Sequence, residues 1–400
     1  MQPTACSPSP TLIGLPTRQT LPPARALSAL FIYFGIIMGS WAGRIPALRD
    51  TLQLSVGELS IVLLCSGLGA ALSSALSSAL STRLPLHFRG WISQRTKLVI
   101  AGLALLFLLL MIGLAPNLPL LMLAVFLLGG SASTFDISMN AAAAHQENLQ
   151  SRSLMARLHA CACAGGLGGV MLGSGMAWLR YSPIQHFSLL ILPCALLLWL
   201  GVRGLSTDLA RNAAVTKKSL FVLPRGDIAL LGMLGLLSAM TEGSIANWSG
   251  VFMAEQFGAS MSFAPLSLAA FSAMMLLSRF HGDRLKAAMG ARRLICGGGF
   301  VAGIGIYLAV FANASPTAVT GFAIAGLGLA LVFPFVFSAA GQQGAMAITG
   351  VATMTYAGSV IGPPLLGGIG QWLGLQAALG FTGLLSLLIA GIGMRVRLLR

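Results

Sequence analysis

The chain has 400 residues, of which 56% are hydrophobic and only 8% charged, and its formal net charge is +15. Soluble globular domains carry about 25% charged residues, so this composition excludes a soluble protein, a disordered chain, a collagen and a disulfide-stapled secreted scaffold. Most of the exterior must face lipid, and the positive surplus has to be explained within a membrane protein.

Apolar stretches long enough to cross a bilayer as helices, about 17–25 residues each, follow one another along the chain. We expect twelve of them, near residues 26–44, 56–80, 97–115, 118–143, 157–180, 184–203, 226–250, 262–281, 294–313, 316–340, 348–370 and 374–394. They predict an all-α membrane protein. Residues 1–25 hold six prolines and no apolar run long enough for a signal peptide, so we expect a disordered cytoplasmic tail there.

Basic residues are distributed very unevenly between the two sides of the membrane. With twelve spans both termini share one side, and that side receives 21 of the 24 basic residues, leaving Arg44, Arg49 and Arg180 on the other. The group of 21 includes five around the end of the eighth span, Arg279, Arg284, Lys286, Arg292 and Arg293. The positive-inside rule therefore predicts that both termini are cytoplasmic. The surplus is a topology signal, and nucleic-acid binding would instead need these charges on one folded surface.

A central polar stretch divides the twelve spans into two groups of six. We expect an N-terminal bundle at 26–203, a cytoplasmic loop at 204–225, a C-terminal bundle at 226–394 and a basic cytoplasmic tail at 395–400. The first span ends in Ser40-Trp41-Ala42-Gly43-Arg44, and the seventh ends similarly in Asn247-Trp248-Ser249-Gly250. A duplicated six-helix unit with a binding site between the halves is the plan of many secondary transporters.

Glycines and cysteines within the spans predict packing and not a cofactor or metal site. Gly166-Leu167-Gly168 resembles part of a dinucleotide fingerprint, but that motif needs a preceding strand. Inside an apolar helix such glycines favour close helix packing. Cys161 and Cys163 are two residues apart and point to different faces of a helix, so they predict neither a metal site nor a disulfide.

Several motifs along the chain match a known pattern. Twelve spans, the central loop and Gly282-Asp283-Arg284 after the eighth span resemble the major facilitator superfamily. Further stretches resemble, more narrowly, the bacterial inner-membrane permeases grouped near the fucose permeases: Ser40 to Asp50, Asp136 to Asn140, His159, Glu242 to Trp248, Gly326 to Ala330 with Pro334, and Tyr356 to Pro364. The resemblance implies two pseudo-symmetric six-helix bundles in the bacterial cytoplasmic (inner) membrane. It also implies a monomer that moves a small-molecule substrate.

Two positions depart from the family pattern. The loop after the second span usually carries Gly-x-x-x-Asp-Arg, but here Ser81 to Phe88 contains no acidic residue. Asn247 stands where relatives tend to carry an aspartate.

Carboxylates inside the spans are the strongest candidates for transport chemistry, because a charge within a bilayer costs about 3 kcal/mol on insertion scales. Asp136 and Glu242 lie deepest in the predicted helices. Asp136 and Asn140 are four residues apart and share a helix face, which would either line a central cavity or clamp two helices together. We expect Glu242 or Asp136 to bind the coupling proton, with Glu242 favoured.

Other polar and aromatic residues are candidates for the same cavity, each with a structural alternative. Arg44 is expected either to pair with one of the two carboxylates or to reach the membrane surface. His159 is either a proton relay or a histidine that bonds its own helix. Asn247 adds a polar group. Trp41, Trp248 and Tyr356 either offer faces to a sugar ring or belong to the interfacial aromatic belt.

The loop after the eighth span is expected to act as a cytoplasmic gate. Asp283 and Arg284, with Arg292 and Arg293, would form an ion pair in only one conformation and so favour one opening over the other. The alternative is an ordinary surface ion pair of little energetic weight.

These features predict a non-enzymatic secondary transporter, driven by protons, for a small polar organic solute such as a sugar-like molecule. Export of a metabolite or drug is the alternative within this class, and a non-transporting membrane sensor is a third. No Gly-x-x-x-x-Gly-Lys-Ser/Thr loop occurs in the chain, so ATP-driven transport by this chain alone is not expected.

Overall fold

The computed structural model describes residues 23–83, 93–150, 154–205 and 224–399. All regular structure in these ranges is helical. The first six long helices are α1 (Pro23–Thr51), α2 (Val56–Arg83), α4 (Gln94–Leu114), α5 (Leu118–Gln150), α6 (Met155–Trp178) and α7 (Pro183–Arg203). The second half contains α8 (Asp227–Phe257), α9 (Leu266–Phe280), α10 (Gly282–Met289), α11 (Ala291–Val310), α12 (Ser315–Leu329), α13 (Val332–Gln342) and α14 (Ala345–Arg395).

The predicted twelve membrane spans are confirmed. Ten described helical segments are long and apolar enough to cross a membrane, and the pair α12–α13 counts as one of them. The longest, α14, is two helices that meet at Gly374, where φ is 84°. The remaining span, the eighth along the chain, is α9, which is shorter than the others and is followed after His281 by α10.

The structure adds detail at several predicted boundaries. The eighth span ends with α9 at Phe280, close to the predicted end, and the stretch after His281 forms the short helix α10 up to Met289. The C-terminal tail forms a short 3₁₀ turn, Arg397–Leu399, that packs on α13 with Val396 and Leu399 buried. Helix α1 already begins at Pro23, while the rest of the predicted N-terminal tail, most of the central loop and residues 84–92 after the second span lie outside the described residues.

Closely packed glycines join helices within the N-terminal half. A Cβ atom on Gly39 of α1 would lie 2.1 Å from the carbonyl oxygen of Gly166 on α6. On α6, a Cβ on Gly169 would lie 2.5 Å from the carbonyl oxygen of Ile36. The two backbones can therefore touch only because these positions lack side chains, which confirms that this part of the chain packs helices together.

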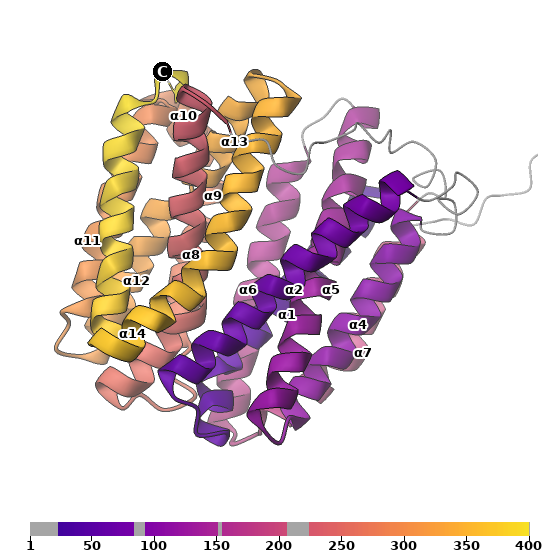
Figure 1. Cartoon of the computed structure of the whole chain (residues 1–400), viewed down its shortest axis with the longest axis vertical. Coiled ribbons are helices and arrows are strands. Elements are labelled where there is room, and N and C mark those ends of the chain that lie inside the picture. The colour runs from indigo at the N-terminus through magenta and orange to yellow at the C-terminus, as the bar shows by residue number, and fades with distance from the viewer. Residues whose placement is uncertain (1–22, 84–92, 151–153, 206–223, 400) are drawn as a thin grey trace, which may run out of the picture.

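The same kind of seam occurs in the C-terminal half, between α8 and α14. A Cβ on Gly358 would lie 2.3 Å from the carbonyl oxygen of Leu236, and one on Gly362 would lie 2.8 Å from Cα of Met240. Figure 1 shows the two six-helix bundles side by side. They meet along α2 and α14, α6 and α9, and α1 and α8.

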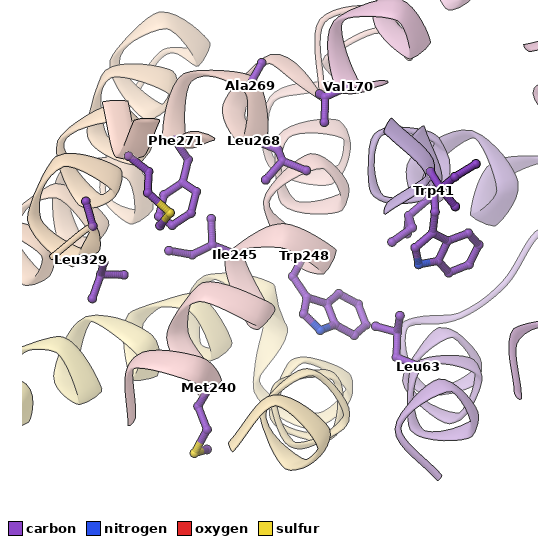
Figure 2. Packing of buried hydrophobic residues seen from close by; sticks show 14 of the residues in the cluster. Trp41, Leu63, Val170, Met240, Ile245, Trp248, Leu268, Ala269, Phe271 and Leu329 are labelled. Carbon is purple, nitrogen blue, oxygen red and sulfur yellow. The ribbon is translucent and has the colours of Figure 1, made fainter. Parts of the chain in front are cut away.

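Buried apolar side chains fill the interior of both bundles and the contact between them. In Figure 2, Trp248 of α8 points towards Leu63 of α2, while Ile245 and Phe271 pack within the C-terminal half. All four side chains are at least nine-tenths buried. Polar groups between the halves are therefore held in a mostly apolar surrounding.

Candidate functional site

Four hydrogen bonds described in the structure cross from one half to the other. Two lie at the end where α1 and α8 finish: Arg49 of α1 pairs with Glu255 of α8, and the amide nitrogen of Gly57 donates to Oε1 of Gln371 at 2.6 Å. Pro46 also packs at this end, 2.9 Å from where a Cβ on Gly250 would lie. The halves are therefore tied together at this end, which the predicted topology places outside the cell.

The third bond between the halves involves Asp136 on α5. The hydroxyl of Tyr356 on α14 donates to Oδ2 of Asp136 at 3.0 Å. Asn140, one turn along α5, donates through Nδ2 to Oδ1 of Asp136 at 2.9 Å and to its carbonyl oxygen at 2.9 Å. The predicted shared face of Asp136 and Asn140 is thus confirmed.

The charge of Asp136 is not balanced by a nearby cation. Both ion pairs in the described part of the chain involve other carboxylates. Its oxygens are met by an amide and a phenol, which are neutral donors, and the phenol ring of Tyr356 is 43% exposed. The group can therefore exchange a proton without breaking an ion pair.

The second intramembrane carboxylate, Glu242 on α8, faces Arg279 on α9. Their closest atoms, Oε1 and Nη2, are 3.7 Å apart, and the two side chains are 28% and 17% exposed respectively. The other oxygen, Oε2, is buried and has no hydrogen-bond partner among the described residues. Glu242 is therefore paired on one side and unsatisfied on the other.

Arg279 supplies the fourth bond between the halves and connects several helices. Its Nη1 donates to Sγ of Cys163 on α6 at 2.9 Å, and its Nε donates to the carbonyl oxygen of Ala330 at 3.1 Å. That carbonyl lies where α12 breaks into α13, four residues before Pro334. Proline has no N–H to bond the carbonyl four residues earlier, so Arg279 satisfies an acceptor that Pro334 leaves free.

Sequence reasoning missed Arg279 because it was assigned to the cytoplasmic loop. Arg279 lies in the last turn of α9, and a second helix, α10, follows it after the turn at His281. Its position within the apolar stretch 262–281 was the available signal. An arginine inside a span needs a partner, and Glu242 was the nearest carboxylate in the sequence that is also intramembrane.

His159 lies on the same side of α6 as Cys163, one turn earlier. Its ring meets Phe31 edge to face, with ring centroids 5.4 Å apart. The residue is exposed. The proton relay stays a prediction.

The two tryptophans are packed into the protein. Trp41 is 7% exposed and Trp248 is fully buried, with Nε1 donating to the carbonyl oxygen of Pro363 at 2.8 Å. Trp248 therefore presents no face to a sugar ring in this conformation. Asn247 bonds its own helix, donating through Nδ2 to the carbonyl oxygen of Gly243 at 2.6 Å.

The structure supports neither of the two roles predicted for Arg44. It pairs with neither Asp136 nor Glu242, and it does not reach the membrane surface, since it is only 1% exposed. Its guanidinium instead donates to the carbonyl oxygens of Gly173 and Tyr181, inside the N-terminal half. The expected charge pair belongs to Arg279.

The predicted gate residues flank the turn at Gly290. Arg284 is exposed on α10, and Arg292 and Arg293 lie in the first turn of α11. Neither ion pair found among the described residues includes them. The side chain of Asp283 lies outside the described residues, so the gate stays a prediction.

Two further features lie apart from the polar bridges. An open crevice of about 330 Å³ lies between α6 and the start of α9, lined by Met171, Ser174, Gly175, Trp178, Ser262, Phe263 and Leu266. It contains none of the bridging residues.

Within the described ranges, no group of three or more His, Cys, Asp or Glu side chains could hold a metal ion.

Comparison with known proteins agrees with this architecture. The family model described as Major Facilitator Superfamily matches residues 26–343. An uncharacterised MFS-type transporter of Yersinia pestis is 30% identical over 366 residues, covering 90% of this chain and 92% of that protein. Membrane protein MosC of Rhizobium meliloti is 28% identical over 375 residues, covering 91% of this chain and 88% of MosC.

Solved structures share the fold at lower identity. The nucleoside transporter NupG superposes with a TM-score of 0.72 at 14% identity, covering 94% of this chain and 98% of that one. A bacterial homolog of the human lysosomal transporter Spinster, in an inward-facing and occupied conformation, gives 0.70 at 12% identity, covering 94% and 96%. At these identities the likeness concerns the fold alone.

Proposed function

We propose that this chain, which belongs to the major facilitator superfamily, carries a small polar organic solute across the bacterial inner membrane by proton-coupled alternating access. Membrane transport follows from the family. The solute, the coupling ion and the direction of transport are the proposal, together with the cytoplasmic location of both termini.

One observation carries the coupling proposal: each intramembrane carboxylate is part of a bridge between the two halves. Asp136 accepts a hydrogen bond directly from Tyr356 of the other half. Glu242 acts through Arg279, which bonds Cys163 of the other half. Any movement that separates the halves here must break or rearrange both bridges, so the charge on each carboxylate influences the movement.

The arrangement of bridges supports an inward-facing conformation. The Arg49–Glu255 pair and the Gly57–Gln371 bond close the end predicted to lie outside. The two carboxylate bridges lie deeper, and no described hydrogen bond joins the halves beyond them. An imported solute would then reach Asp136, Tyr356 and Arg279 from the outside once the outer pair has separated, and it would leave to the cytoplasm in the conformation described here.

The polar groups between the halves favour a polar solute. Asn140, Tyr356 and His159 are neutral groups that can each donate and accept hydrogen bonds, as hydroxyl-rich or amide-containing molecules require. A lipophilic drug would leave these groups unpaired, at a cost in binding free energy.

The proposed direction of transport is uptake, driven by an inward proton gradient.

The test uses purified full-length protein in proteoliposomes that hold a pH-sensitive dye. Monosaccharides, nucleosides and amino acids are added in turn, and proton and solute movement are both recorded. We expect one class to enter together with protons. Asp136→Asn and Glu242→Gln should abolish accumulation under a pH gradient, whereas Glu58→Gln should not, because that carboxylate only caps α2 through Ser55.

Two results would overturn the proposal. If a solute stabilises the protein against heat but is never moved, the chain is a sensor. If both carboxylate variants still accumulate solute under a pH gradient, neither group carries the coupling proton.

A further inference from the structure

A second polar cluster lies inside the N-terminal half, away from the bridges between the halves. It consists of Arg44 on α1 and His186 on α7, which both lie against Gly173 of α6. Arg44 is 1% exposed and His186 is fully buried. The transport proposal makes no use of either residue.

Both side chains keep unpaired polar atoms. The Arg44 guanidinium donates through Nη1 to the Gly173 carbonyl at 3.3 Å and through Nη2 to the Tyr181 carbonyl. Its Nε, and both ring nitrogens of His186, are buried and have no hydrogen-bond partner among the described residues. Arginine has five N–H donors and an imidazole has at least one, and buried donors are normally bonded. Arg44 and His186 therefore lack a hydrogen-bond acceptor for their buried N–H groups.

The unpaired atoms are close neighbours. A Cβ on Gly173 would lie 3.2 Å from Cε1 of His186 and 3.6 Å from Cδ of Arg44. Cε1 is covalently bonded to both ring nitrogens, and Cδ is bonded to Nε. The missing side chain of Gly173 thus lets the unsatisfied parts of Arg44 and His186 converge on one place.

The cluster also lacks a negative charge. Neither ion pair in the described ranges involves Arg44, and its carbonyl partners carry only partial charges. A buried cation is normally accompanied by an opposite charge, because removing it from water is costly. We propose that Arg44 and His186 hold a small monovalent anion inside the N-terminal half, with chloride as the probe.

Among the described residues of the C-terminal half, the matching position holds no arginine. When Trp41-Ala42-Gly43-Arg44 is matched with Trp248-Ser249-Gly250-Val251, the arginine position is taken by Val251. Val251 is 1% exposed, like Arg44, but its side chain is apolar. The same buried position therefore needs no counter-ion in one half and needs one in the other.

The experiment compares thermal unfolding of the purified full-length protein in sodium chloride and in sodium gluconate at equal ionic strength. Gluconate is too large for a fully buried site. We expect a midpoint about 5 °C higher at saturating chloride, since a ligand that binds only the folded state stabilises it. Crystals grown in bromide should show an anomalous peak between Nε of Arg44 and the ring of His186.

Variants make the assignment specific. His186→Phe leaves the carbonyl bonds of Arg44 intact and should abolish the chloride effect, as should Arg44→Gln if it folds. Arg203→Gln removes an exposed arginine that stacks on Trp199, so its chloride effect should equal that of the wild type. The proposal is wrong if the wild type shows no chloride effect and no bromide peak, or if His186→Phe keeps the full effect. Neither result bears on solute transport.

Discussion

The two intramembrane carboxylates are held in contrasting ways. Asp136 is bonded by neutral groups only, the amide of Asn140 and the phenol of Tyr356. Glu242 faces a guanidinium, and that guanidinium also bonds a thiol and a free carbonyl. The two carboxylates therefore differ in what their neutralisation changes. A proton on Asp136 breaks no ion pair, while a proton on Glu242 removes the charge partner of Arg279, which also bonds α6 and the junction between α12 and α13.

The largest effect is expected from removing that cation. Arg279→Met should cost about 3 kcal/mol in unfolding free energy, because Glu242 loses its partner and the Ala330 carbonyl loses its donor. Transport should be abolished. Chemical unfolding in detergent measures the loss, and the double variant with Glu242→Gln should recover part of it. No recovery would mean that the two side chains are not coupled.

Glu242→Gln alone should have a smaller effect on stability, about 1–2 kcal/mol, since Arg279 keeps its bonds to Cys163 and Ala330. We expect solute accumulation under a pH gradient to be abolished. Initial rates in proteoliposomes measure it. A wild-type rate would remove Glu242 from the coupling scheme.

Asp136→Asn should allow the solute to cross the membrane without being coupled to protons. An asparagine oxygen can still accept the hydroxyl of Tyr356, so stability should change by less than about 1 kcal/mol. Accumulation against a gradient should be lost, while exchange of internal for external solute continues and no longer depends on pH. Pronounced unfolding instead would show that the Asp136 cluster is mainly structural.

Tyr356→Phe tests the smallest contribution. It deletes one hydrogen bond between the halves, worth about 1 kcal/mol, and leaves the ring in place. The rate of transport should change a few-fold while coupling to protons persists. Tyr307→Phe is the matched control, since that ring stacks on Phe311 within the C-terminal half. Equal behaviour of the two variants would contradict a role for the bridge.

The sequence predicted the spans well because length and hydropathy are local properties. It also placed Asp136 with Asn140, since four residues make one helical turn. The partners of the carboxylates could not be found this way. Tyr356 lies 220 residues from Asp136, and their meeting depends on how α5 and α14 face each other across the two halves. A hydropathy profile does not show which glycines bring two helices into contact, so it cannot predict how the helices are oriented.

Arg279 and Arg44 show the same limit for charges. Counting basic residues by loop assigned Arg279 to the cytoplasmic side because it lies at the end of the eighth span. In the structure, Arg279 takes the role predicted for Arg44 and faces the carboxylate of Glu242, while Arg44 bonds backbone carbonyls. Charge patterns report the orientation of a membrane chain, but the pairing of a given charge depends on its depth.

The small number of bonds between the halves sets the energy scale of switching. Four described hydrogen bonds hold the halves in this conformation, and each contributes about 1 kcal/mol net. Losing one shifts the ratio of two conformers by about fivefold, so two or three losses can reverse which one predominates. A bound solute or a single proton therefore has enough free energy to change the population, and so does a point mutation.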